Sequence, residues 1–327
     1  MHRTAIALVL GLLAAAVPLR AQQTWVLVIA GIGGEPKYTE SFQSWGEAIV
    51  TAAQERAGVP AANVTYLAEK EGAARATGVS RKEAVQAAFA SLAQKATASD
   101  LVFVVILGHG SFLNNESRVN LPGPDLTAQD FAVMLQPIQA RIAFANTTSS
   151  SGEFAKVLAG PNRAIVTATK SGMERNEAVF GGYFAQAFAD DVADTDKDGR
   201  ISLLEAYEYA RVETQRFYEG QTRLMTEHAQ IVDSGDAPSA EAGPGKPNGA
   251  LAARMFLGGF GAPGAPANAS PALRALYERR RGIENRVEDL KAVKDTMDPV
   301  RYEQEIEQLL LELAQVSAEI RRMEGGG

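Results

Sequence analysis

"DLVFVVILGHGSF", residues 100–112, joins an unbroken apolar run to an abrupt polar exit. The run from 101 to 107 consists of Leu, Val, Phe and Ile, a composition typical of a strand that is buried on both faces of its sheet. Such strands occur in parallel sheets, because helices there cover both faces. The run ends at Gly108-His109-Gly110, so a titratable imidazole directly follows the strand.

The segments on either side of this run alternate short apolar stretches with stretches of helical spacing. Residues 24–31, 63–69, 140–146 and 162–172 predict four further strands with helices between them. This alternation is typical of a mostly parallel sheet, so we expect an α/β fold built as a three-layer sandwich. A late apolar piece, residues 249–259, is expected to close the sheet as its last strand.

Side-chain caps are predicted at the starts of two helices. Ser80 and Glu83 have the spacing of a capping box, in which each side chain bonds to the backbone N–H of the other residue. Thr127 directly precedes a helical pattern and is expected to cap it. Both residues therefore predict where a helix begins.

Composition limits the classes of function. The chain has 327 residues, of which 46% are hydrophobic, and a formal net charge of −7, so a globular protein with a substantial core is expected. No basic stripe with interleaved aromatic residues occurs, so nucleic acid is not an expected partner. The absence of cysteine excludes disulfides, thiolate metal sites and a thiol nucleophile.

Residues 1–21 have the pattern of a secretory signal peptide. His2 and Arg3 precede an apolar run over 5–17, and Ala21 is a small residue at which a peptidase can cut. The apolar run is too short to span a membrane comfortably. We therefore expect an exported protein, periplasmic or secreted, that begins near Gln22 and has no membrane span after processing.

The C-terminal part differs in character from the α/β pattern of residues 22–257. Residues 258–269 are rich in Gly, Pro and Ala and predict a linker. Residues 270–327 are highly charged and predict two helices, interrupted where Asp298 can cap and Pro299 can occupy the first helical position. Because the break is short, the two helices are expected to fold back as an antiparallel hairpin.

Apolar residues in this segment recur at the spacing of a coiled coil. The first half repeats every seven residues at Leu276, Ile283 and Leu290. The second half alternates spacings of four and three at Tyr302, Ile306, Leu309, Leu313, Val316, Ile320 and Met323. Such a seam predicts association, either with a partner helix or by dimerisation.

The acidic stretch "DTDKDGRISLLE", residues 194–205, has the spacing of an EF-hand-type calcium loop. Gly199 stands at position six, where the loop turns sharply. The expected ligands are Asp194, Asp196, Asp198, the carbonyl of Arg200, Ser202 and Glu205. A hard cation takes six to eight oxygen atoms, and this order supplies them, so we predict bound Ca²⁺. The alternative is an acidic helix connection that remains open to solvent.

A second polar exit follows the strand predicted at 140–146. Residues 141–154, "RIAFANTTSSSGEF", run into three consecutive serines and a glycine. A turn of this kind can present a nucleophile or can simply cap the next helix. Because the carboxyl ends of parallel strands share one edge, His109 and Ser149 are expected to face the same crevice.

Taken together, "VILGHG" and "IAFANTTSSSGEF" resemble the caspase-like superfamily of cysteine peptidases, and within it the legumain-like and bacterial caspase-like branches. In those families a His-Gly ends the third strand, and an Asp/Glu-x-Cys-x-Ser-Gly motif ends the fourth. The resemblance places the histidine on His109 and the nucleophile on Ser149. It places the Ser-Gly pair on Ser151 and Gly152, and the acidic position on Thr147.

The resemblance covers residues 24–257 and implies a caspase-like sandwich with a substrate cleft at the strand ends. The cleft residues implied are Gly110, Ser151, Gly152, Lys170 and Arg175. The catalytic cysteine of the family is replaced by serine here. A serine hydroxyl needs a hydrogen-bonded base that is oriented by a third group, and the sequence offers no obvious orienting acid.

Two functions from different classes follow from this substitution. We expect a non-proteolytic, caspase-like or legumain-like domain, a pseudopeptidase that binds calcium and a peptide or protein partner. The alternative is an active hydrolase, a peptidase or esterase, with Ser149 as nucleophile and His109 as base, or with Ser150 in place of Ser149. A purely structural spacer, with the hairpin carrying the function, is a third reading.

Overall fold

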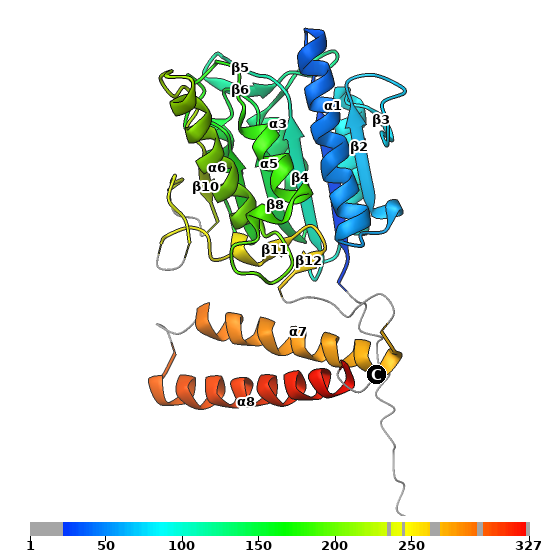
Figure 1. Ribbon diagram of the computed structural model, residues 1–327, viewed down its shortest axis with the longest axis vertical. Coiled ribbons are helices and arrows are strands. Elements are labelled where there is room, and N and C mark those ends of the chain that lie inside the picture. Colours follow the sequence, from blue (N-terminus) through cyan, green and yellow to red (C-terminus); the bar gives the residue numbers. More distant parts are fainter. Residues whose placement is uncertain (1–21, 234–236, 244–245, 262–268, 293–296, 325–327) are drawn as a thin grey trace, which may run out of the picture.

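The computed structural model describes residues 22–233, 237–243, 246–261, 269–292 and 297–324. The predicted signal peptide, residues 1–21, lies outside the described residues. An α/β domain and a C-terminal pair of helices make up the described chain (Figure 1).

A seven-stranded sheet forms the centre of the α/β domain (Figure 1). In spatial order its strands are β10 (Gln230–Val232), β9 (Arg163–Thr167), β8 (Arg141–Asn146), β4 (Leu101–Leu107), β1 (Thr24–Ala30), β2 (Val64–Ala68) and β3 (Gly78–Val79). All neighbours pair in parallel except β10, which is antiparallel to β9. The five predicted strands and the mostly parallel sheet are confirmed.

The prediction that residues 249–259 close the sheet is wrong, because β10 occupies that edge. Instead β11 (Met255–Phe256) pairs antiparallel with β12 (Gly259–Phe260) in a separate ribbon. Gly259 has φ of +151°, a conformation that favours glycine and lets the chain reverse at once. The ribbon also shows that the α/β domain extends to residue 260, into the segment predicted as linker.

Helices cover both faces of the sheet and create two cores. One face is covered by α1 (Pro36–Thr51), α5 (Phe180–Ala189) and α6 (Leu203–Gly220). The other is covered by α2 (Lys82–Lys95), α3 (Ala128–Leu135) and α4 (Gly152–Leu158). Successive residues of β4 point alternately into the two cores, as its unbroken apolar run requires. Short helical turns lie at Ala52–Arg56, Ala61–Asn63, Asp191–Ala193 and Ala252–Arg254.

A small antiparallel sheet follows β4 where only a loop was expected. Its strands are β5 (Gly110–Leu113), β6 (Glu116–Val119) and β7 (Leu126–Thr127). Asn114 and Asn115 form the β5–β6 turn with φ of 54° and 63°, the left-handed pair that a two-residue hairpin requires. Figure 1 shows this sheet at the end of the domain opposite to β11 and β12.

One predicted helix cap is confirmed and one is wrong. Thr127 accepts a hydrogen bond from Asp130 N at 3.1 Å and forms a capping box with that residue. The hydroxyl of Ser80 instead donates to the Ala30 carbonyl at 2.6 Å, and α2 begins without a side-chain cap. Ser80 is fully buried against the end of β1. Its hydroxyl therefore bonds to a distant strand, although its position in the sequence predicted a bond to the start of the helix.

The C-terminal helices α7 (Pro271–Ala292) and α8 (Pro299–Glu324) form the predicted antiparallel hairpin. Tyr277 bonds to Glu324, and Arg286 lies 3.6 Å from Glu312, a pairing that fixes the opposite directions. Asp298 caps α8 by accepting from Arg301 N at 3.0 Å.

The predicted apolar seam is packed between the two helices of the hairpin. Leu309, Val316 and Ile320 of α8 are buried against Ile283 and Leu290 of α7. Met323, predicted as a seam residue, is 38% exposed because it lies in the last turn of α8. Among the described residues, no helix is both long and apolar enough to cross a membrane.

Candidate functional site

Both candidate catalytic residues lie at the carboxyl edge of the sheet. Strands β4 and β8 are parallel neighbours, and Ile106 is aligned with Asn146. The chain segments that carry His109 and Ser149 therefore leave the sheet side by side, and a shared crevice for the two side chains stays a prediction.

Ser149 is buried, with 3% exposure, and its hydroxyl is bound to the backbone of the residue after His109. It donates to the Gly110 carbonyl at 3.1 Å and accepts from Gly110 N–H at 3.2 Å. A Cβ atom on Gly110 would lie 2.1 Å from the Ser149 carbonyl oxygen, so only glycine allows this approach. The hydroxyl proton is thus engaged by a main-chain carbonyl.

His109 packs against aromatic residues of α1. Its ring lies edge-on to Tyr38 and Phe42, with centroid distances of 4.6 and 5.1 Å. Burial lowers the pKa of His109, although a backbone hydrogen bond with Gly33 and the charge of Glu177 act in the opposite direction. Within the described residues, no hydrogen bond joins this ring to the Ser149 hydroxyl. Burial thus favours the neutral form of the imidazole, and the hydrogen bonds that hold Ser149 come from Gly110.

Ser150 has an unusual backbone conformation. Its φ is +56°, in the left-handed region that a residue with a side chain adopts at a cost. Its N–H donates to the Glu174 carbonyl at 2.8 Å. The hydroxyl is buried and has no hydrogen-bond partner among the described residues.

Ser151 and Gly152 pack the start of α4 closely against the segment that follows β9. The Ser151 hydroxyl lies 3.2 Å from that of Thr169, and Gly152 N donates to the same Thr169 oxygen at 3.0 Å. A Cβ atom on Gly152 would lie only 2.2 Å from Ser171 N. These two residues of the predicted motif therefore hold the edge together by close packing.

Lys170 and Arg175 form an exposed lip beside this edge. Lys170 Nζ lies 3.8 Å from Glu174 Oε1, and the Arg175 guanidinium lies 5.9 Å from the centre of the Phe112 ring. The Glu174 carboxylate also accepts from His228 N at 3.1 Å and bonds to His228 Nδ1. Glu174 and His228 are 54 positions apart, so no local sequence signal predicted this pair.

Glu227 is a second residue at this edge that sequence analysis missed. It is 2% exposed and accepts from Val179 N at 2.9 Å and Phe180 N at 3.2 Å, at the start of α5. Burial raises the pKa of Glu227 to about 7, although these backbone hydrogen bonds act in the opposite direction. The carboxyl group therefore titrates near neutral pH.

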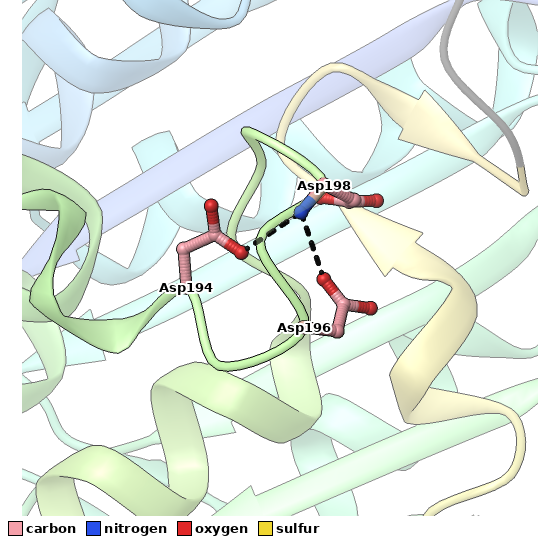
Figure 2. Close-up of side chains that lie close together, drawn as sticks. All are labelled: Asp194, Asp196 and Asp198. Atoms are coloured by element: carbon pink, nitrogen blue, oxygen red, sulfur yellow. Dashed lines mark hydrogen bonds between the residues drawn. The ribbon is translucent and has the colours of Figure 1, made fainter.

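The acidic loop lies at the opposite end of the domain. Oxygen atoms of Asp194, Asp196 and Asp198 all lie within 4.8 Å of one another (Figure 2). Asp198 N donates to Asp194 Oδ1 at 3.2 Å and to Asp196 Oδ1 at 3.1 Å, and Gly199 N donates to Asp194 Oδ2 at 3.0 Å. The pKa of Asp196 is raised by burial and by the neighbouring carboxylates. The loop thus holds three acidic groups around one point.

The remaining predicted ligands lie around the same loop. Ser202 caps α6, and Glu205 Oε2 accepts from Ser202 N at 2.9 Å. Glu205 Oε1 accepts from Thr195 N at 2.9 Å, so this carboxylate reaches back to the start of the loop. The donor set consists of oxygen atoms alone, which fits a hard cation. No other group of three such metal-binding side chains occurs in the part of the chain that the structure describes.

Two solved structures that resemble this chain share little sequence identity with it. No family model matches the chain, and no curated protein matches it. The solved structure of protein GSU0716 from Geobacter sulfurreducens is 13% identical, covers 64% of this chain and 92% of its own, and has a TM-score of 0.42. The caspase drICE is 12% identical, covers 65% of this chain and 87% of its own, and has a TM-score of 0.40.

Proposed function

We propose that the α/β domain is a caspase-like or legumain-like domain without proteolytic chemistry, which binds a peptide or protein partner at the carboxyl edge of its sheet. The observation that carries this proposal is the double hydrogen bond between the Ser149 hydroxyl and the Gly110 backbone. Activation of serine requires that a base accept the hydroxyl proton. Here the hydroxyl donates its hydrogen bond to a carbonyl oxygen, which is not a base at neutral pH and cannot take up the proton.

The lip offers the contacts for such a partner. Lys170 is exposed and Arg175 lies beside the Phe112 ring, so cationic and aromatic groups meet at the rim of the edge. An acidic or aromatic peptide segment matches this combination through ion pairs and ring contacts. The serine turn contacts the segment that leads to the lip, because Ser150 N donates to the Glu174 carbonyl at 2.8 Å.

The chemistry is tested with a serine-reactive fluorophosphonate probe and a peptide library, using the full mature chain with calcium. We expect neither labelling nor cleavage in the wild type or in Ser149→Ala. Labelling or cleavage that disappears in Ser149→Ala would instead establish the alternative, an active hydrolase with Ser149 as nucleophile and His109 as base.

Binding is tested separately with the same library on a surface. We expect peptides to be retained by the wild type and lost when Lys170 and Arg175 are both changed to Glu. Lys156→Glu is the matched control, because Lys156 is also exposed but lies on α4 outside the lip. Equal retention by the lip variant would exclude this surface as the binding site.

The acidic loop is the second part of the proposal: we infer that it binds Ca²⁺ as a structural clamp between α5 and α6. The grouped carboxylates and the position of Glu205 support this role. The predicted export of the protein would place the loop where calcium is abundant, so even a weak site would be filled.

Association through the C-terminal helices completes the proposal. Because the predicted seam is packed between α7 and α8, a partner helix or a second copy of the chain would have to use another face. Leu310 and Leu311 of α8 are 50% and 58% exposed and provide one. Light scattering on the wild type and on a variant with both leucines changed to Gln would detect dimerisation through this face.

A further inference from the structure

A small pocket lies at the carboxyl ends of β1 and β2, where α1 runs beside β2 (Figure 1). Its volume is about 170 Å³, and it is lined by the ends of both strands, by α1 and by residues 69–73, which follow β2. Phe42 of α1 lines the pocket and also packs against the His109 ring at 5.1 Å. Neither His109 nor Ser149 lines it, so the pocket is separate from the candidate catalytic residues.

Glu69 brings a carboxylate to this pocket in a fixed position. Its Oε2 accepts from the Thr39 hydroxyl at 2.7 Å and from Gly33 N at 3.2 Å. Position 33 requires glycine for this approach, because a Cβ atom would lie 2.4 Å from Thr39 N. Oε1 accepts no hydrogen bond from the described residues, although it is not closed off from solvent. One oxygen atom therefore anchors the carboxylate, and the other is available to a donor.

Much of the remaining lining is apolar or small. Phe42 and Tyr66 are 4% and 0% exposed, so aromatic side chains form the buried wall of the pocket. Gly46 makes room for Tyr66, because a Cβ atom at position 46 would lie 2.5 Å from the Tyr66 hydroxyl oxygen. Ala30 and Ala68 contribute small side chains at the ends of the two strands. A ligand that fits this lining has a polar head and an apolar body.

Charge and size restrict the ligand further. The charged residues that line the pocket are Glu69, Lys70 and Glu71, two carboxylates against one ammonium group, so a cation is favoured over an anion. A cavity of about 150 Å³ holds one benzene molecule, so this pocket suits a ligand of about five to eight non-hydrogen atoms. Drug-sized ligands occupy pockets of about 300 Å³ or more and are too large.

We propose that this pocket binds a small organic cation, a primary alkylammonium group whose head donates to Glu69 Oε1 and whose chain packs against Phe42 and Tyr66. A hydrogen bond between two charged groups is shorter and stronger than one between neutral groups. The aromatic rings attract a cation as well. The inference is independent of the proposed peptide and calcium sites, because neither the lip nor the acidic loop lines this pocket.

Such a group has two sources, a free amine and the lysine side chain of a peptide. The probes are therefore n-butylammonium and an alanine peptide with one central lysine and blocked ends, each added to the full mature chain. Saturation-transfer NMR detects weak binding, and a titration gives the dissociation constant. We expect n-butylammonium to bind, and n-butyrate, which has a similar size and the opposite charge, not to bind. Binding of the peptide alone would assign the pocket to lysine side chains, and binding of the amine alone to free amines.

Glu69→Gln removes the charge and keeps an oxygen atom that can accept from Thr39 and Gly33. We expect this variant to bind n-butylammonium at least about tenfold more weakly, because the charge-assisted hydrogen bond is lost. Glu40→Gln, at an exposed site on α1 that does not line the pocket, is the control and should bind as the wild type does. Circular dichroism establishes that both variants keep their helices.

Ala73→Leu tests the volume of the pocket without changing its charge. Ala73 is half-buried and lines the pocket, so the larger side chain should fill the space and abolish binding. Ala87→Leu, at an exposed site on α2, is the matched control. This pair and the butyrate comparison remain decisive if Glu69→Gln does not fold. Absence of binding by both cationic probes, equal binding of n-butyrate, or wild-type affinity in Glu69→Gln or Ala73→Leu would overturn the proposal.

Discussion

The carboxyl edge of the sheet and the acidic loop at its other end are both rich in polar side chains, but the polar groups are satisfied differently. At the carboxyl edge, hydroxyl groups bond to nearby backbone: Ser149 to Gly110, and Thr147 to the Ile106 carbonyl at 2.7 Å. In the loop, Asp194, Asp196 and Asp198 lie together and accept from N–H groups of the loop itself.

The two regions differ in how well the protein alone satisfies their polar groups. A hydroxyl is both donor and acceptor, so neighbouring backbone groups can satisfy it completely. Three carboxylates carry like charges, and neutral N–H groups offset their repulsion only in part. The Ser149 hydroxyl is therefore satisfied by protein groups alone, whereas the grouped carboxylates of the loop lead us to predict that a cation stabilises it.

The largest expected effect concerns Glu227, the buried carboxyl group at the carboxyl edge. Its pKa is raised from 4.5 to about 7 in the folded protein, mainly by burial. The unfolded chain therefore releases its proton first, so this group's contribution is fully present below pH 4.5 and is lost as pH rises through 7. We expect the free energy of unfolding of the wild type to fall by about 3 kcal/mol relative to Glu227→Gln over this range.

Urea denaturation at a series of pH values measures this difference between the two proteins. Glu219→Gln is the control, because Glu219 is exposed on α6 and should leave the pH profile unchanged. Parallel profiles for the wild type and Glu227→Gln would mean that this carboxyl group is solvated, and that the carboxyl edge is less closed than its hydrogen bonds indicate.

The second prediction tests the loop. Calcium at about 100 times its dissociation constant should stabilise the wild type by about 2.7 kcal/mol, which corresponds to a rise in Tm of about 5 to 10 °C. Asp194→Ala should abolish this rise, because Asp194 is the first predicted ligand and also accepts a hydrogen bond from Gly199 N. Differential scanning calorimetry with and without calcium makes the measurement.

Asp190→Asn is the matched control for Asp194→Ala. Asp190 is exposed and precedes the loop, so this variant should keep the full calcium response. An equal rise in Asp194→Ala would remove the contrast between the two regions, since the loop would then be an acidic connection that needs no ion.

The fold was predictable from the sequence where one signal dominated. The apolar run of β4 can be buried only inside a sheet covered on both faces, and the parallel architecture follows from that run. The spacing of the acidic loop brought its three aspartates together as expected, because the ligand positions of such a loop lie within twelve residues.

The sequence was misleading where distant residues determine local structure. The apolar residues around Met255 are equally suited to a sheet edge and to a folded ribbon. The structure has the ribbon, in which Gly259 adopts a positive φ that favours glycine. Ser80 had the spacing of a helix cap, but its hydroxyl donates a hydrogen bond to the Ala30 carbonyl, 50 positions away. The pairing of Glu174 with His228 and the burial of Glu227 also depend on tertiary contacts that have no local pattern.

A smaller effect is expected for Ser149→Ala. The change removes one hydroxyl that satisfies both the N–H and the carbonyl of Gly110, so it should cost about 1.5 kcal/mol of unfolding free energy. Urea denaturation at pH 7 makes this measurement. A stability equal to that of the wild type would show that water replaces the hydroxyl, and the serine would then be more accessible than its burial indicates.

The smallest effect concerns Ser150, which differs from Ser149 in having a positive φ and an unpaired buried hydroxyl. Ser150→Gly relieves the backbone strain and removes the hydroxyl, but it adds entropy to the unfolded chain, so we expect a net stabilisation of about 0.5 kcal/mol. Ser150→Ala keeps the strain and should lie within about 0.5 kcal/mol of the wild type. Loss of stability in both variants would mean that the Ser150 hydroxyl has a hydrogen-bond partner when the edge is solvated. The carboxyl edge would then be a candidate ligand site, as the loop is.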